Sequence, residues 1–358
     1  MGGMGSAVTM RHFIELSLYG PNGYFRKAGP LIIDAPHALT SNSARQLNSA
    51  VGKLYRDSPQ SEFATASSLF RESYAEAVSA WCRQRNVTTV VEVGAGSGAL
   101  ACSLLALNSD IKRYESVEIS GELAAAQRRA ASAAGVSARH RVHVQSFFDW
   151  QFVPQRDDGN VALLAFEVFD NLACDKLVVS PSGSAKQAWV ETRPDGTRAE
   201  VYRDVTDARI AKCLQLWLDV HPAPADRPKG FVLWLPTAAF DFAERTKRLF
   251  DVDKLSLLIA DFDALPPSRV VGTNAPTVQC NAIASGLADD TIKTFHDVLR
   301  APFGCVDIMF ETSFEFLRRC FGARQLVVEK HSDFLYKFSR MPKATREYYR
   351  NFAVLRSQ

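Results

Sequence analysis

Short apolar runs alternate with helix-like patterns through the middle of the chain. The apolar runs cover residues 87–93, 114–119, 141–145 and 161–166, and helical patterns at 98–107 and 121–133 separate the first three. This alternation is typical of a parallel sheet with helices on both of its faces. The pattern therefore predicts the α/β class, with a Rossmann-like sheet.

The region before the first apolar run is patterned as helix. Residues 10–25 read as a short amphipathic helix that ends at a Gly-Pro-Asn-Gly turn. A second stripe of apolar residues, at Leu69, Tyr74, Val78 and Trp81, predicts a helix at about 66–85. We therefore interpret residues 1–85 as an N-terminal helical extension and residues 86–172 as the first half of the Rossmann-like core.

After residue 172 the pattern changes to short strands separated by turn residues. Runs at 176–179 and 187–190 flank Pro-Ser-Gly-Ser and precede Pro-Asp-Gly, which predicts antiparallel hairpins. We interpret 173–228 as an inserted β-hairpin, substrate-binding region that ends in a proline-rich loop at 221–228.

The α/β rhythm then returns, and residues 229–358 read as the second half of the core. A helix is predicted near 237–250, a buried strand at 255–260, and two further strands at 326–329 and 334–338. Within this half, the segment 263–300 has weak periodicity and is interpreted as a surface loop or a lid.

Composition places the chain among ordinary globular proteins. It has 358 residues, of which 47% are hydrophobic and 23% charged, enough to bury a core in one large or two smaller domains. The formal net charge of +3 gives no indication of a nucleic acid or an anionic membrane as partner, and leaves contact with a ribonucleoprotein open. No apolar stretch approaches the roughly 18 residues of a membrane span.

The seven cysteines are scattered, with no C-x-x-C pair and no histidine at metal-ligand spacing. We interpret them as reduced thiols and predict no metal site. Reduced thiols favour a reducing compartment such as the cytosol or the mitochondrial matrix.

Three alternating glycines follow the apolar run at 87–93. Gly94, Gly96 and Gly98 permit a tight turn and a close approach of the backbone to a ligand, at the start of a helix whose free N–H groups face the same point. The run also fits the looser dinucleotide fingerprint, so a nicotinamide or flavin cofactor and a purely structural turn stay open. Glu92 favours a third alternative, because a carboxylate there would repel a pyrophosphate but suits the ammonium group of S-adenosyl-L-methionine.

Two later strand ends supply further candidates for binding this cofactor. Glu118 ends the strand at 114–119, where a carboxylate can accept both hydroxyl groups of a ribose. Ser146 and Phe147 follow the strand at 141–145 and could frame an adenine through a hydrogen bond and an aromatic face. Phe147 could equally be a core residue, and Glu118 could be an exposed charge.

The best catalytic candidates follow the strand at 161–166. Glu167 and Asp170 place two carboxylates three residues apart at a strand end, and Asp261 is a third candidate at the end of a later strand. Paired carboxylates can hold a protonated guanidinium in one plane and receive its proton as a methyl group is transferred. The alternative is a helix-capping Asp170 beside a solvated Glu167.

Several motifs in order resemble the MidA-type methyltransferase family. They are the Leu-Tyr-Gly-Pro-Asn-Gly-Tyr-Phe opening, the loop at 92–98, Val-Glu-Ile-Ser at 117–120 with Gln127, Glu-Val-Phe-Asp-Asn-Leu at 167–172, Ile-Ala-Asp-Phe at 259–262, and a late segment at 296–307. The resemblance implies a class I S-adenosyl-L-methionine fold. It also implies protein arginine methylation, in mitochondrial members that assist the assembly of respiratory complex I.

Departures from the family's pattern gather on the substrate side. Ser61-Glu-Phe-Ala-Thr65 stands where the family has Gly-Asp-Phe-x-Thr, and Phe166, Asp263, Met309 and Ser313 replace expected residues. Two interpretations follow. The chain is an active protein methyltransferase in the mitochondrial matrix, or it is a weak or inactive scaffold in the assembly of complex I or the mitochondrial ribosome. A dehydrogenase is a distant third, and the oligomeric state is not predicted.

Overall fold

The computed structural model describes residues 7–26, 32–59, 61–153, 155, 159–222, 230–280, 292–323 and 325–358. The chain forms two compact units, each built from three segments. The insertion unit comprises Met1–Lys27, Phe169–Glu244 and Ala264–Cys320, and the core unit comprises Ala28–Val168, Arg245–Asp263 and Phe321–Gln358. The predicted extension at 1–85 therefore contributes to both units.

The core unit is organised around a seven-stranded sheet in the order β13-β14-β10-β5-β2-β3-β4. Its strands are β2 (Val87–Val93), β3 (Arg113–Glu118), β4 (His140–Val144), β5 (Asn160–Phe166), β10 (Ser256–Phe262), β13 (Leu326–Lys330) and β14 (Phe352–Ser357). The five strands from β10 to β4 are parallel, and β14 is antiparallel to both of its neighbours.

Strand order in this sheet reverses between β2 and β5. The chain runs outward from β2 through β3 to β4 and then returns to β5 on the other side of β2. In open parallel sheets, a crevice for ligands forms at the carboxyl ends of the strands at such a reversal. The ends of β2, β3, β5 and β10 are therefore the place to look for a site.

Helices cover this sheet, and an apolar core joins them to it. They are α2 (Ala44–Asp57), α3 (Ala66–Gln84), α4 (Ala99–Leu107), α5 (Gly121–Ala133), α11 (His331–Phe338) and α12 (Lys343–Arg346). Helix α3 packs against α4 and α11, and its Trp81 and Tyr74 are almost fully buried in the core. The predicted fold class, an α/β sheet with helices on both faces, is confirmed.

The insertion unit contains a second, five-stranded sheet of order β1-β7-β6-β9, with β8 paired to β7. Its strands are β1 (Ala7–Thr9), β6 (Asp175–Val179), β7 (Ala185–Thr192), β8 (Arg198–Asp204) and β9 (Phe231–Leu235), and a separate pair joins β11 (Thr277–Gln279) to β12 (Asp307–Met309). The pairs β6–β7 and β7–β8 are antiparallel hairpins, as the turn residues predicted.

Among the described residues of the insertion unit, the helical elements are α1 (Met10–Tyr19), η1 (Tyr24–Arg26), α6 (Ala208–Val220) and α9 (Phe295–Val298). Helices α7 (Thr237–Leu249) and α10 (Phe314–Phe321) begin in this unit and end in the core unit. The predicted proline-rich loop lies largely outside the described residues, as does the middle of the segment predicted to be a lid or a surface loop.

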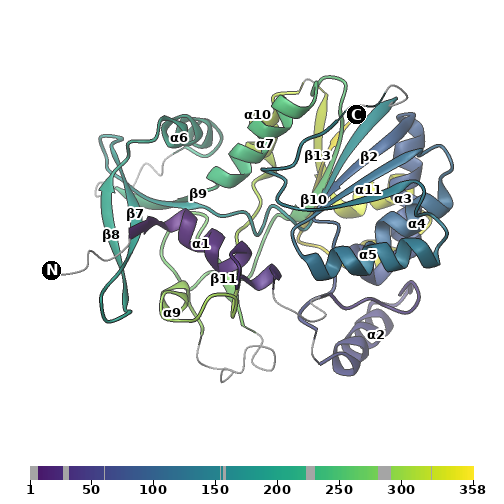
Figure 1. Ribbon diagram of the computed structural model, residues 1–358, viewed down its shortest axis with the longest axis horizontal. Coiled ribbons are helices and arrows are strands. Elements are labelled where there is room, and N and C mark those ends of the chain that lie inside the picture. The colour runs from purple at the N-terminus through teal and green to yellow at the C-terminus, as the bar shows by residue number, and fades with distance from the viewer. Residues whose placement is uncertain are drawn as a thin grey trace. The chain divides into compact units, whose positions relative to one another are not determined.

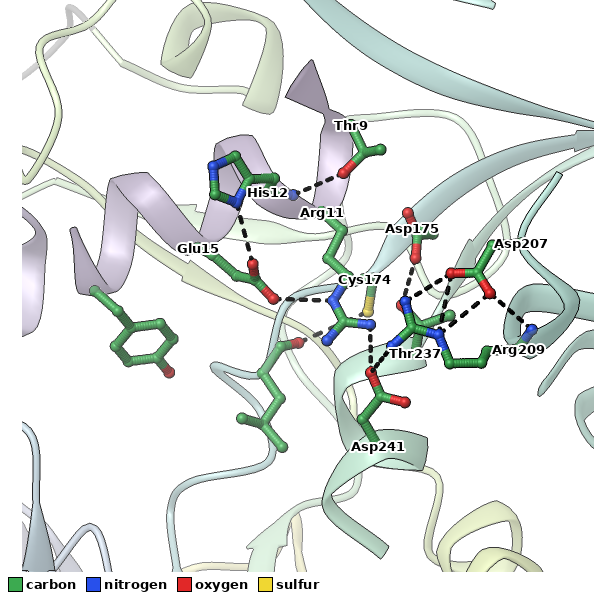
Figure 2. Close-up of polar contacts among 12 residues, drawn as sticks. Thr9, Arg11, His12, Glu15, Cys174, Asp175, Asp207, Arg209, Thr237 and Asp241 are labelled. Carbon is green, nitrogen blue, oxygen red and sulfur yellow. Dashed lines mark hydrogen bonds and ion pairs between the residues drawn. The ribbon is translucent and has the colours of Figure 1, made fainter. Parts of the chain in front are cut away.

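A charged network joins α1 to α7 in the insertion unit (Figure 2). Arg11 of α1 donates from Nη1 to Asp241 of α7 at 2.7 Å and from Nε to Glu15 at 2.9 Å. Arg209 forms a hydrogen-bonded pair with Asp207 at the start of α6 and lies 3.8 Å from the same Asp241. Arg11 is mostly buried, so its two acidic partners offset the cost of removing its charge from water.

One predicted strand is wrong. Residues 334–338 belong to helix α11 rather than to a strand. Phe334, Leu335 and Phe338 fall on one side at helical spacing, whereas Tyr336 between them is 70% exposed. The second late strand is instead β14, at the end of the described chain.

None of the helices in the described part of the chain is both long and apolar enough to cross a membrane.

Candidate functional site

The glycine loop at the end of β2 adopts a backbone that only glycine enters readily. Gly94, Gly96 and Gly98 have φ angles of 68°, 56° and 81°. A Cβ atom at each would lie 2.6–2.8 Å from a neighbouring side chain, namely Val168, Ile32 and Gln127 respectively. The loop is thus both left-handed and closely surrounded, and Gly98 is the N-cap residue of α4.

Glu118, at the end of β3, is tied to this loop. Its Oε2 accepts the N–H of Gly96 at 3.0 Å and its Oε1 accepts the N–H of Ser120 at 2.9 Å. Burial raises the pKa of this carboxyl to about 7, although both hydrogen bonds oppose the rise. Glu118 is therefore a buried and oriented carboxyl beside the glycine loop, not the exposed charge of the alternative interpretation.

Glu92 lies in β2, two residues before the loop, and is also buried. The hydroxyl of Tyr114 donates to its Oε2 at 2.7 Å. Burial raises its pKa to about 8, and the nearby Glu118 contributes to the rise. A cationic group placed between these two carboxyls would favour their charged forms, which is the electrostatic fit expected for an ammonium.

Ser146 and Phe147 follow β4, as predicted. Ser146 accepts the N–H of Phe148 through its Oγ at 3.2 Å. Phe147 is 4% exposed and stacks on Trp150 with 6.3 Å between ring centroids, whereas Phe148 is 36% exposed. Phe147 is thus a core residue by its surroundings, and its role beside an adenine stays a prediction.

Glu167 and Asp261 come together at the ends of neighbouring strands β5 and β10. Asp261 Oδ2 accepts the N–H of Val168 at 3.1 Å, and the N–H of Glu167 donates to the carbonyl of Ala260 at 3.0 Å. Glu167 Oε1 also accepts the N–H of Ala66, the first residue of α3, at 2.9 Å. Glu167 itself has a φ of 55°, which is unusual for a residue other than glycine.

The electrostatics of this pair suit a cation. Burial, with a smaller contribution from the charge of Asp261, raises the pKa of Glu167 to about 8, although the hydrogen bond from Ala66 opposes the rise. Asp261 is fully buried and accepts the N–H of Phe262 at 2.7 Å through its second oxygen. A guanidinium or ammonium group beside both would offset their repulsion.

Asp170, the predicted partner of Glu167, belongs to the insertion unit. It is 3% exposed, and its carbonyl accepts the N–H of Phe310 at 2.7 Å. Its neighbour Asn171 donates to Asp307 and to the carbonyl of Ile308. The structure thus joins Glu167 to Asp261 within one unit, and the pairing of Glu167 with Asp170 stays a prediction.

Sequence reasoning gave no role to two residues that shape the loop. Gln127 of α5 donates through Nε2 to the carbonyl of Gly96 at 2.7 Å, and its side chain fills the space that a Cβ on Gly98 would need. Tyr114 holds Glu92 through its hydroxyl. In the sequence, Gln127 stands out only as part of the resemblance, and Tyr114 reads as one more apolar strand position. Among the described residues, no group of three His, Cys, Asp or Glu side chains is placed to hold a metal ion.

Most of the chain matches one known protein family. Residues 72–331 match the model of the family described as “Putative S-adenosyl-L-methionine-dependent methyltransferase”. The chain belongs to this family. No curated protein sequence matches the chain.

Two solved structures from Burkholderia thailandensis share the fold. One is an uncharacterized protein of the COG1565 superfamily, 18% identical over 98% of this chain and 87% of that chain, with a TM-score of 0.62. The other is a COG1565 superfamily member bound to S-adenosyl-homocysteine, 18% identical over 98% of this chain and 88% of that chain, with a TM-score of 0.65.

These findings confirm the predictions of the family, the fold and the cofactor. The family resemblance, the class I methyltransferase fold and S-adenosyl-L-methionine as the cofactor all agree with the family match. The glycine loop is compatible with that cofactor, because its three left-handed glycines place no Cβ atoms on a backbone that is already closely surrounded. That Glu118 binds the ribose and Glu92 the ammonium stays a prediction.

Proposed function

We propose that the chain transfers a methyl group from S-adenosyl-L-methionine to a guanidinium nitrogen of an arginine in a protein. The observation that carries the proposal is that Glu167 and Asp261 lie at adjacent strand ends of the core unit, with Asp261 hydrogen-bonded to the residue after Glu167 and raising the pKa of Glu167. When bound, the cofactor supplies an activated methyl on a sulfonium, so the chain has mainly to align the acceptor and balance its charge.

The two carboxyls have different tasks in this proposal. Both oxygens of Asp261 already accept backbone N–H groups, so this carboxylate stays fixed and contributes negative charge. Glu167 accepts one N–H through Oε1, which leaves Oε2 to orient a guanidinium N–H. The bond between sulfur and the methyl group would be replaced by a bond between the methyl group and the acceptor nitrogen, and the electron pair of the broken bond would stay on sulfur. The proton displaced from the acceptor nitrogen would pass to Glu167.

The test is transfer of radioactive methyl groups from S-adenosyl-L-methionine to proteins of an extract that lacks this chain. We expect methylarginine after acid hydrolysis of the products. Glu167→Gln and Asp261→Asn should each reduce the rate at least ~100-fold, because each removes a charge that the acceptor needs. Both variants should keep cofactor affinity, and Glu76→Gln on the exposed side of α3 is the matched control.

Two outcomes would contradict the proposal in different ways. Methylation of another residue type would keep the transferase and change the acceptor. Cofactor binding without any transfer, together with retained partner binding in the Glu167→Gln variant, would favour the second candidate, an inactive scaffold. The altered substrate-side motifs, such as Ser61–Thr65 in place of the family's pattern, are the observation that keeps this candidate in view.

We extend the proposal to the setting of the acceptor. The resemblance to the MidA-type family implies a mitochondrial protein as the acceptor, in the assembly of complex I, and an assembly intermediate of the mitochondrial ribosome is the alternative setting. Purification of the tagged chain from its own cells should then recover subunits of a partly assembled complex from the mitochondrial fraction. Recovery of the chain without such subunits would contradict the assembly role, and loss of partners after ribonuclease treatment would indicate a ribonucleoprotein.

A further inference from the structure

Arg71 interrupts helix α3 with a backbone conformation that arginine rarely adopts. Its φ and ψ are 42° and −119°, and the helix continues on both sides of it. In the described chain, the other residues besides glycine with positive φ are Asn86, Asn274 and the candidate catalytic Glu167. Asparagine tolerates this region, but glutamate and arginine do so only where the surroundings hold them.

The guanidinium of Arg71 is only partly satisfied. Nη1 donates to the carbonyl of Ala35 at 2.8 Å. Nε is buried and has no hydrogen-bond acceptor among the described residues, and it lies 3.5 Å from a carboxylate oxygen of Glu72, whose side chain is 54% exposed. A guanidinium carries five N–H donors, so most of this group's capacity is left for another acceptor.

The same guanidinium acts on the glycine loop and on the start of α4. Its Nη1 contacts the carbonyl of Ala35, next to Asp34, whose Oδ1 accepts the Ser97 hydroxyl of the loop at 3.0 Å. Burial raises the pKa of the Asp34 carboxyl, and the positive charge of Arg71 opposes this rise. Burial raises the pKa of the Cys102 thiol in the first turn of α4, the charge of Glu92 adds to this rise, and the charge of Arg71 opposes it. Arg71, hydrogen-bonded to the residue after Asp34, and Glu92, two residues before Gly94, are therefore opposite charges close to the same glycine loop.

This arrangement matches the two charges of an α-amino acid. The methionine part of the cofactor carries an ammonium and a carboxylate on one carbon atom, and Glu92 suits only the ammonium. We propose that Arg71 binds the α-carboxylate of S-adenosyl-L-methionine and thereby selects a methyl donor in which that carboxylate is intact. A bidentate guanidinium–carboxylate contact would use the unsatisfied N–H groups and would explain why α3 keeps a strained arginine.

This inference rests on the cofactor of the proposed function and is tested by binding rather than by turnover. The probes are S-adenosyl-L-methionine and its decarboxylated analogue, titrated calorimetrically into the wild-type protein and into Arg71→Gly. We expect the wild-type protein to prefer the intact donor by at least ~10-fold, as a charged hydrogen bond allows. Arg71→Gly should bind the intact donor at least ~10-fold more weakly and bind both probes alike.

Glycine at this position separates binding from folding. Arg71→Gly removes the guanidinium but also relieves the left-handed strain, so its Tm should be unchanged or higher. Arg71→Lys should recover part of the preference, because it restores a charge without the bidentate geometry. Arg83→Ala, later in the same helix, is the control that should leave the preference intact.

Each result bears on a distinct claim. If Arg71→Gly keeps the wild-type preference for the intact donor, the role of Arg71 is overturned while the proposed function stands. If the wild-type protein binds neither S-adenosyl-L-methionine nor S-adenosyl-homocysteine, the proposed function itself fails, and the role of Arg71 fails with it.

Discussion

Gly94 and Gly135 share nearly the same backbone angle but lie in different surroundings. Their φ values are 68° and 67°, yet a Cβ on Gly94 would lie 2.7 Å from Val168, while a Cβ on Gly135 would meet no atom within 4 Å. Alanine at either position costs about 1–2 kcal/mol for the left-handed backbone. Gly94→Ala should cost a further ~1–3 kcal/mol because of overpacking.

Urea denaturation of the two variants measures this difference, and titration with S-adenosyl-homocysteine shows its functional side. Gly135→Ala should bind the ligand like the wild-type protein, whereas Gly94→Ala should lose binding. Equal stability losses in both variants would mean that the glycine loop tolerates side chains, contrary to its role as a close-fitting cradle.

The buried Glu92 makes stability depend on pH. Its pKa rises from 4.5 to about 8 on folding, so the folded protein holds a proton that the unfolded chain has lost. The stabilising contribution of this bound proton is complete below about pH 4.5 and is lost as the pH rises toward 8. Glu92→Gln, whose neutral amide can still accept from Tyr114, should match the wild-type protein in stability at pH 5 and exceed it at pH 8.5.

The measurement is the free energy of unfolding in urea at the two pH values, without cofactor. The difference at pH 8.5 should be at least ~1 kcal/mol, since one pKa unit corresponds to about 1.4 kcal/mol. Glu76→Gln on the exposed face of α3 should show no such dependence. If the free energies of unfolding of Glu92→Gln and the wild-type protein differed by the same amount at both pH values, burial of the charged carboxylate would not be the cause of the pH dependence.

At the scale of elements, the Arg11–Asp241 ion pair links α1 to α7. The two side chains are 20% and 17% exposed, and Glu15 supplies the second, more exposed partner of Arg11. Asp241→Asn should reduce the stability of the insertion unit by about 1–3 kcal/mol, because it leaves a mostly buried guanidinium with one anion. Glu15→Gln should cost about 1 kcal/mol or less. Near-equal losses, measured by thermal unfolding, would contradict this ranking.

The elements that the sequence predicted well are those with strong local patterns. The chain from β2 to α5 alternates apolar runs with glycine and serine caps, so local rules place each element. Strand β8 was missed because residues 198–204 are mostly polar, and pairing across the turn with β7 makes them a strand. The strand at 334–338 failed because five residues are too few to separate a helical from an alternating pattern.

The candidate site shows the same division between local and long-range information. Glu92, the glycines and Glu118 were predictable, since each follows from its position at a strand end. The proximity of Glu167 to Asp261 depends on β10 pairing beside β5, some ninety residues later, and no local pattern encodes that pairing. Arg71 reads as an ordinary helical charge, and only the backbone angle of the folded chain distinguishes it.

At the scale of the molecule, the two units are interwoven in sequence. The chain passes from one to the other after residues 27, 168, 244, 263 and 320, so no single cut separates them. The proposed binding residues Glu92, Gly96 and Glu118 nevertheless lie entirely in the core unit. The cofactor should therefore stabilise this unit directly, and the insertion unit only through whatever folding cooperativity the shared chain imposes.

Hydrogen exchange can separate these two effects. With S-adenosyl-homocysteine at about 100 times its Kd, mass action stabilises the bound state by about 2.7 kcal/mol. Amide exchange should slow most in the glycine loop, the first turn of α4 and the end of β3, because these groups surround the ligand or hydrogen bond to residues that hold it. The β7–β8 hairpin of the insertion unit should change little, because its exchange proceeds by local opening of its own strands.

Gly96→Arg, whose side chain would occupy the glycine loop, should show no slowing of amide exchange in either unit. Equal slowing in both units would mean that they open as one cooperative body, and the ligand would then regulate the insertion unit as well.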